Sequence, residues 1–170
     1  MVKRKGAPVR TRRNIQRYGD PYLPKLDAGE VAVCQGCRAV FRRRHWTLDE
    51  ALYARATAGD GARQTTCPAC RKVRDGYFGG EVTLAAGPFL SRHKEEILNL
   101  IRNEEGRAKG INPLERIIAL SEKNGAVVVT TTNEKLAQRI GRELRKAYRG
   151  RAVFHWSEDT KCLRVKWVRE

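Results

Sequence analysis

Two pairs of closely spaced cysteines constrain the fold of this chain more than any other feature of its sequence. Both Cys34-Gln35-Gly36-Cys37 and Cys67-Pro68-Ala69-Cys70 have the spacing C-x-x-C. Such a turn presents two sulfur ligands from one side, and two turns complete the tetrahedral shell of four thiolates that zinc prefers. The spacing therefore predicts one structural Zn²⁺ ion in a treble-clef or zinc-ribbon-like domain. Its expected ligands are Cys34, Cys37, Cys67 and Cys70.

The segment between the two cysteine pairs is long enough to hold additional structure. Short strands are expected on both sides of the first pair, at residues 30–33 and 39–41. Thr47 followed by Glu50 matches the capping-box pattern and predicts a short helix over residues 47–56. His45 lies close by, but four cysteines already complete the zinc shell, so His45 is assigned to a basic patch.

Two other uses of the cysteines fit the sequence less well. A redox dithiol needs one C-x-x-C pair and gives no reason for a second. A catalytic zinc ion keeps one coordination position open for water, whereas four cysteines close the shell. A zinc-dependent nuclease or nucleotide-modifying enzyme would also need an H-x-E motif, a Gly-rich phosphate loop or carboxylates beside histidine. We therefore expect no enzymatic activity.

The charge of the chain favours a polyanionic partner. Its 170 residues include 35 Lys+Arg and 19 Asp+Glu, a formal net charge of +16. Residues 1–29 are expected to form a disordered basic arm, because glycine and proline interrupt any helical period and little apolar surface is available to bury. The candidate RNA contacts of this arm are Arg10, Arg12 and Arg13. A solubilising tail is the alternative interpretation.

A second basic cluster follows the first cysteine pair. Three consecutive arginines, Arg42, Arg43 and Arg44, precede Trp46. This pattern suits phosphate contacts beside a ring on which a base can stack. A solvated loop with Trp46 packed on the ribbon agrees equally well with the sequence, so both interpretations stay open.

Glycine and proline residues between positions 71 and 88 mark the predicted boundary between a zinc-ribbon domain (30–87) and an α/β domain (88–170). One short strand is expected before it, at 81–84. Helical periodicity predicts a helix over 89–107, and Asn112-Pro113 predicts a second over 114–123, ended by Asn124-Gly125. The remaining elements are a strand at 126–131, a helix at 133–149, and strands at 151–157 and 161–168. This β-α-β-β order places the chain in the α+β class.

The predicted helix over residues 133–149 has a basic stripe opposite its apolar side. Spacings of four and three residues place five cations on one face. Solvation does not require a single sign of charge, and like charges at i, i+4 repel each other, so the stripe indicates an RNA contact. Its members are Lys135, Arg139, Arg142, Lys146 and Arg149.

The last two strands are expected to form a hairpin. A two-residue loop, Glu158-Asp159, would pair Ser157 with Thr160. In that register Ala152, Phe154, Leu163, Val165 and Trp167 share the core face. Arg164 and Lys166 lie on the opposite, basic face and are further candidate RNA contacts. Cys162 is expected on the basic face as a single thiol that binds no metal.

The order of these parts matches a known family. Asp20-Pro21-Tyr22 is followed by CQGC, CPAC, FLSRHKEEILNLIRNEEGRA and VVVTTTNEKLAQRIGRELRKAYRG. The chain resembles small bacterial zinc-ribbon proteins of uncharacterised function. These proteins in turn look like the N-terminal part of the archaeal and eukaryotic large-ribosomal-subunit export adaptor, the family named for nonsense-mediated decay. The resemblance implies zinc at the four cysteines and association with ribosomal RNA.

Together these features predict a zinc-binding, non-enzymatic RNA-binding protein associated with ribosomal RNA or a ribosomal subunit, in assembly, quality control or stress. A DNA-binding regulatory protein is the alternative, although no helix-turn-helix or two-cysteine, two-histidine finger pattern is present. No apolar run approaches the roughly 20 residues of a membrane helix, and the N-terminus lacks the apolar region of a secretory signal. We expect a protein of the reducing cytoplasm with no small-molecule substrate.

Overall fold

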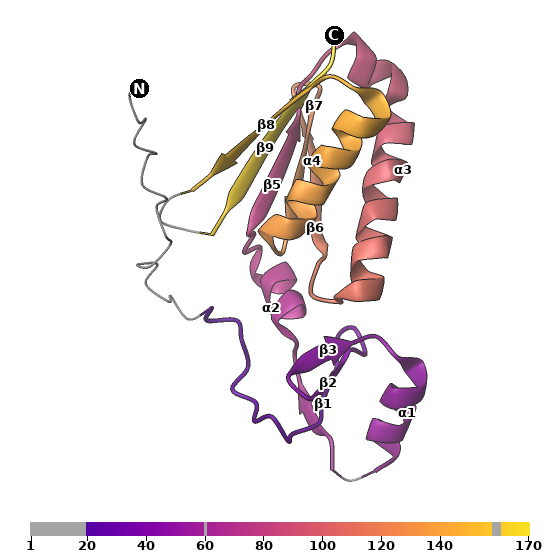
Figure 1. Ribbon diagram of the computed structural model, residues 1–170, viewed down its shortest axis with the longest axis vertical. Helices are drawn as coiled ribbons and strands as arrows, with labels where there is room; N and C mark the ends of the chain where they lie inside the picture. Colours follow the sequence, from indigo (N-terminus) through magenta and orange to yellow (C-terminus); the bar gives the residue numbers. More distant parts are fainter. Residues whose placement is uncertain (1–19, 60, 158–160) are drawn as a thin grey trace, which may run out of the picture.

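The computed structural model of the protein describes residues 20–59, 61–157 and 161–170. Its elements follow the chain as two groups (Figure 1). The first group contains β1 (Ala32–Cys34), β2 (Val40–Arg42), β3 (His45–Thr47), α1 (Glu50–Ala58), β4 (Arg63–Thr65) and α2 (Pro68–Asp75). The second contains β5 (Gly80–Leu84), α3 (Pro88–Ile111), β6 (Ile117–Lys123), β7 (Ala126–Thr131), α4 (Glu134–Tyr148), β8 (Arg151–Trp156) and β9 (Leu163–Val168). The predicted α+β class is confirmed.

The first sheet is small and is built around the segments that carry the cysteines. Its strand order is β3-β2-β1-β4, with β1 antiparallel to β2 and parallel to β4. The core beneath it consists mainly of alanine and cysteine side chains and one ring pair, Phe41 and Trp46, whose centroids are 5.4 Å apart. A core this small gives little hydrophobic stabilisation, so a bound metal is expected to contribute much of the stability of this part.

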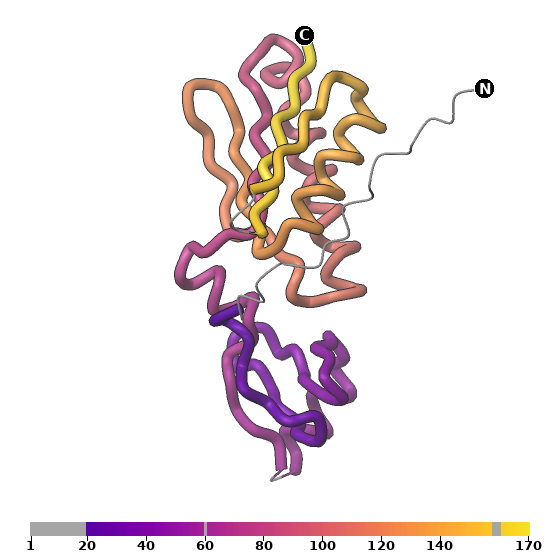
Figure 2. The backbone as a smooth tube through the Cα atoms, turned by 60° about the vertical axis from the view of Figure 1, so that its left-hand side comes forward, coloured from indigo at the N-terminus to yellow at the C-terminus, as the bar shows by residue number. Residues whose placement is uncertain are grey.

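The second sheet has five strands in the order β6-β7-β5-β9-β8. Its central strand β5 is antiparallel to β7 and parallel to β9. Helices α3 and α4 both lie on one face of this sheet (Figure 2), and no element in the described part of the chain covers the other face. A Cβ atom at Gly141 would lie 2.7 Å from Val165 Cγ1, so glycine allows α4 to pack closely against β9.

The predicted helix over residues 114–123 is wrong. These residues include β6, which pairs in antiparallel fashion with β7. Asn124 and Gly125, with φ values of 52° and 74°, form the two-residue turn between the strands. Positive φ at both central positions is the type I′ geometry, which matches the twist of a hairpin and favours Asn-Gly. The Asn-Gly pair that we interpreted as a helix end is therefore a hairpin turn.

The predicted domain boundary at residue 87 falls too late in the chain. Strand β5 lies between β7 and β9, so residues 80–84 belong to the second sheet and not to the zinc-binding part. A strand of five residues does not specify locally which sheet it joins, because its neighbours come from residues 126–131 and 163–168. Sheet membership places the boundary between α2 and β5.

Part of the predicted basic arm is in contact with the rest of the protein. Asp20 accepts a hydrogen bond from Lys72 Nζ at 2.9 Å, and the rings of Tyr22 and Tyr77 lie 4.9 Å apart. The chain from residue 20 onward is therefore attached to α2 and to the turn that follows it. Residues 1–19 lie outside the described part of the chain.

Two further differences are local. Asp49 caps α1 by accepting a hydrogen bond from the Leu52 backbone at 2.8 Å, while the predicted cap Thr47 pairs with Val40 in β3. The β8–β9 register is shifted by two residues from the prediction, and Ser157 bonds to Cys162. An even shift leaves the side chains of β8 and β9 on their predicted faces, so the core face of this hairpin is as expected. Among the described helices, none has both the length and the apolar composition of a membrane span.

Candidate metal centre and nucleic-acid interface

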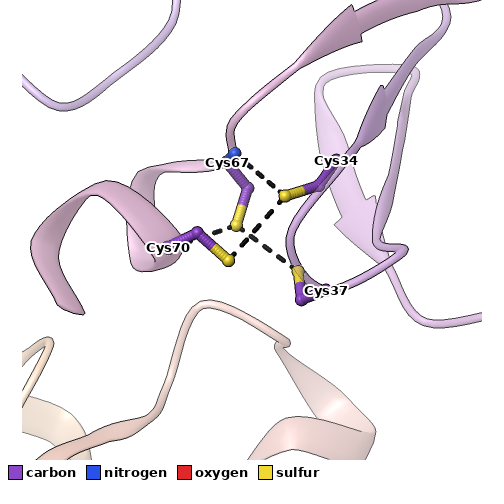
Figure 3. Close-up of side chains that lie close together, drawn as sticks. All are labelled: Cys34, Cys37, Cys67 and Cys70. Carbon is purple, nitrogen blue, oxygen red and sulfur yellow. Dashed lines mark hydrogen bonds between the residues drawn. The ribbon is translucent and has the colours of Figure 1, made fainter. Parts of the chain in front are cut away.

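The four predicted zinc ligands lie together (Figure 3). Their sulfur atoms are all within 4.8 Å of one another. Cys34 Sγ lies 3.8 Å from Cys70 Sγ, and Cys37 Sγ lies 3.6 Å from Cys67 Sγ. Tetrahedral zinc with Zn–S bonds of about 2.3 Å requires sulfur atoms about 3.8 Å apart. The cluster therefore has the ligand type, number and spacing of a structural zinc site.

The first cysteine pair is held by the turn between β1 and β2. Cys34 accepts a backbone hydrogen bond from Arg38 at 3.0 Å and donates one to Ala39 at 2.8 Å. Arg38 has a φ of 64°, which turns the chain back towards β2. Gly36 leaves room for the facing sulfur, because a Cβ atom there would lie 3.1 Å from Cys70 Sγ. These contacts fix the two sulfurs on one side of the turn.

The second cysteine pair comes from the first turn of α2. Cys67 is the N-cap, and its sulfur accepts a hydrogen bond from the Cys70 backbone at 3.4 Å. Pro68 follows at the start of the helix, where a missing N–H is tolerated. The Cys67 backbone also donates to Cys34 Sγ at 3.2 Å, which joins the two pairs. The positive end of the helix dipole favours thiolates at this position.

The close contacts between the sulfurs shift the pKa values of three of the cysteines in different directions. Hydrogen bonding to the Cys34 sulfur raises the pKa of Cys37 to about 11 and also raises the pKa of Cys67. The same contacts, with Cys37 first, lower the pKa of Cys34. These directions favour a Cys34 thiolate that accepts hydrogen bonds from the Cys37 and Cys67 thiols, and a divalent cation would favour the thiolate form of its ligands.

A guanidinium from the second part of the chain also reaches the cluster. Arg116 Nη1 donates to Cys70 Sγ at 3.2 Å. The backbone of Arg116 is fixed by hydrogen bonds in both directions with Thr132, at 2.9 Å each. A four-thiolate zinc site has a net charge of −2, so this cation offsets part of it. Sequence analysis missed Arg116, because 46 residues separate it from Cys70 and no local motif marks it.

Replacing Arg116 with methionine is expected to lower zinc affinity about 10- to 100-fold, the range typical for hydrogen-bond partners of metal ligands. The measurement is zinc competition against a chromophoric chelator. Arg71→Met removes a cation of α2 itself, next to Cys70 in the chain, whose side chain has no described sulfur contact, and serves as the control. Equal zinc affinity in the two variants would show that the Arg116 contact has no role at the metal.

The Arg42–Arg44 cluster forms the tip of a hairpin. Strands β2 and β3 pair with Arg42 opposite His45, so Arg43 and Arg44 make the two-residue turn. All three arginines are exposed. Trp46 is only 8% exposed and packs against Phe41. Of the two interpretations left open for Trp46, the structure therefore agrees with packing on the ribbon, and the ring is not available for stacking with a base.

Four of the five residues in the predicted basic stripe of α4 are exposed: Lys135, Arg142, Lys146 and Arg149. The fifth, Arg139, points towards α3. Its guanidinium lies 3.9 Å from the carboxylates of Glu104 and Glu115, whose side chains are only 5% and 9% exposed. Arg139 is 33% exposed and lies beside two buried carboxylates, so it is less available to RNA than the other four, and its RNA contact stays a prediction.

Arg164 and Lys166 occupy the uncovered face of the second sheet, as predicted. Helix α4 packs on the opposite face of the sheet, but Arg164 and Lys135 of the α4 stripe line the same cleft at one end of the sheet. Arg164 also lies 4.0 Å from Glu81. The candidate contacts of the arm, Arg10, Arg12 and Arg13, lie outside the described residues. Cys162 is buried, not exposed on the basic face, and is not part of the four-sulfur cluster.

Comparisons of the chain with protein-family models, curated proteins and solved structures found no match. The zinc assignment therefore depends on the geometry of the four sulfurs. The resemblance to the bacterial zinc-ribbon proteins and the export adaptor stays a prediction from the sequence.

Proposed function

We propose that this protein is a zinc-stabilised RNA-binding protein that docks on ribosomal RNA and acts by binding, without catalysis. The closed shell of four cysteines supports the last point, because it leaves no coordination position for a reacting water. The resemblance described above favours ribosomal RNA as the partner. The main structural support for binding to a nucleic acid is the hairpin tip at Arg43 and Arg44.

The backbone at this tip is unfavourable for arginine. Arg43 and Arg44 have φ values of 51° and 66°. The type I′ turn that this geometry defines favours Asn-Gly, since a side chain with a Cβ atom at positive φ costs about 1 kcal/mol. Two arginines at these positions therefore lower the stability of the fold. Residues that occupy an unfavourable backbone conformation are often functional, which favours a binding role for these two side chains.

The side chains at the tip are available for phosphate. Neither Arg42, Arg43 nor Arg44 forms an ion pair with a carboxylate in the described part of the chain. The Phe41–Trp46 ring pair lies directly beneath the turn and holds the strands. A guanidinium group can form paired hydrogen bonds with phosphate, and its planar shape reduces the side-chain entropy lost per hydrogen bond. This arrangement supports recognition of a nucleic-acid backbone.

The test is co-sedimentation of the full chain with ribosomal subunits on a sucrose gradient, at low and moderate salt, with the wild type and the double variant Arg43→Asn/Arg44→Gly. Wild type is expected to migrate with one subunit and to resist moderate salt. The variant is expected to gain about 1 kcal/mol of stability from its relaxed turn and to bind about tenfold more weakly, because two phosphate contacts are lost.

Arg55→Asn, which removes an exposed arginine from α1, is the matched control and should leave binding unchanged. Wild-type protein that stays at the top of the gradient would reject docking on the ribosome. Binding to duplex DNA that is as tight as binding to the ribosomal subunit would favour the DNA-binding alternative.

A further inference from the structure

A cleft of about 670 Å³ lies where the zinc-binding part meets the second sheet. One wall comes from residues 20–23 and from α2 with the turn after it. The other comes from the first residues of α4 and from the start of β9, which lie above α2 in Figure 1. Clefts that bind ligands of nucleotide size have volumes of about 300–1,000 Å³. The size of the cleft therefore suits one or two nucleotides.

The first wall carries apolar and aromatic side chains that remain exposed. Tyr77 is 48% exposed and Leu23 is 58% exposed. The Tyr77 ring is supported by Tyr22, with centroids 4.9 Å apart and planes inclined by 35°. Lys72 Nζ lies 5.7 Å from one ring centroid and 5.9 Å from the other. Tyr77 is thus a fixed, solvent-accessible ring, which is what stacking with a base requires.

The second wall carries cations. Lys135, Lys161 and Arg164 line the cleft, and all three are exposed. Two carboxylates also line it. Asp20 is paired with Lys72 at 2.9 Å, and Glu134 lies in the first turn of α4. With Asp20 and Lys72 paired, three cations and one carboxylate are left, so the lining of the cleft has a net positive charge. Residues 1–19, which contain seven Lys+Arg and no acidic residue, join the chain at Asp20 on its rim.

We propose that this cleft binds an unpaired segment of RNA, with one base stacked on Tyr77 and the adjacent phosphates contacted by Lys135, Lys161 and Arg164. The inference depends on the proposed RNA-binding function and adds the form of RNA that is recognised. In a duplex the bases stack on one another and cannot present a face to Tyr77. An unpaired segment can offer the base to the aromatic wall and its phosphates to the basic wall.

The experiment is fluorescence anisotropy of the full chain with a labelled uridine oligomer of about ten nucleotides, a length typical of single-strand sites, and with an RNA duplex of equal length. Wild type is expected to prefer the oligomer. Tyr77→Ala should weaken oligomer binding about tenfold, whereas Tyr77→Phe, which keeps the ring, should bind like wild type. Lys135→Glu and Lys161→Glu should weaken binding and reduce the salt dependence.

Lys123→Glu, at the far end of β6, has the same charge change outside the cleft and is the control. Near-equal binding of the oligomer by Tyr77→Ala and wild type, or equal effects of Lys161→Glu and Lys123→Glu, would reject the cleft as the binding site. If wild type still binds the duplex in that case, the proposed RNA-binding function stands. Wild type that binds neither RNA would reject both, and circular dichroism of each variant establishes that it is folded.

Discussion

Removal of zinc is expected to unfold residues 32–75 while the sheet formed by β5–β9 stays folded. Structural zinc contributes on the order of 10 kcal/mol to the folding of small domains. The buried core of the zinc-binding part consists mainly of small side chains, with Phe41 and Trp46 as its only large ones among the described residues. The second sheet has a separate core that includes the large side chains Leu84, Ile97, Ile140 and Trp167. The two parts therefore differ in how much they depend on the metal.

Hydrogen exchange monitored by mass spectrometry measures this difference. Chelation, or the substitution Cys67→Ser, should remove amide protection from β1, β2 and α2 and leave it nearly unchanged in β5, β7 and α4. Cys162→Ser is the matched control, because Cys162 is the one cysteine outside the described four-sulfur cluster. Protection of β1 and β2 that survives chelation would contradict a metal-dependent fold.

Zinc affinity should also fall as the pH is lowered. Cys37 and Cys67 have raised pKa values in the thiol cluster, so zinc must displace their protons in order to bind. Deprotonation becomes easier as the pH rises, and affinity therefore increases with pH. A chelator competition series over several pH values measures this trend.

Reversing the charge of Arg139 is expected to destabilise the protein by about 3–5 kcal/mol, the range seen when one partner of a buried ion pair is removed. Arg139→Glu would place a third carboxylate beside Glu104 and Glu115, both of which are buried. Arg107, which donates to Glu104 at 2.6 Å, would be the remaining described cation paired with that carboxylate. For a chain of this length the loss corresponds to a melting temperature lower by about 6–20 °C.

Arg142→Glu is the matched variant, because Arg142 is exposed on the same helix and has no described ion pair. It should change the melting temperature little and weaken RNA binding. Thermal unfolding and RNA affinity measured together separate the two roles. A melting temperature of Arg139→Glu close to that of Arg142→Glu would mean that Arg139 does not balance the buried carboxylates.

The zinc site is the part of this protein that could be predicted most fully from the sequence. Cys34 and Cys37 lie on one turn, and Cys67 and Cys70 lie on another, so each pair is fixed by local geometry. Only the approach of the two turns depends on the fold. Arg116 shows the limit, because its contact with Cys70 is made by a residue far along the chain.

The basic stripe of α4 shows a similar limit. Helical spacing placed Lys135, Arg139, Arg142 and Lys146 on α4, whereas Arg149 follows the end of the helix with a φ of 61°. The sequence does not specify where the neighbouring helix α3 packs against this one. Helix α3 brings Glu104 beside the stripe, and the loop before β6 brings Glu115 there. Arg139 is thereby partly covered and paired with carboxylates, while Arg142, one turn away, stays exposed.

The sequence by itself determined the features that arise over a few residues: the two cysteine turns, the apolar alternation of β9, and the helical period of α3 and α4. Only the tertiary structure decided which strands became neighbours, where β5 belongs, and that residues 117–123 form a strand. It also created the cleft between Tyr77 and Lys161. The physical reason is that strand pairing and charge balance depend on partners distant in the chain, whereas turns and helical faces depend on adjacent residues.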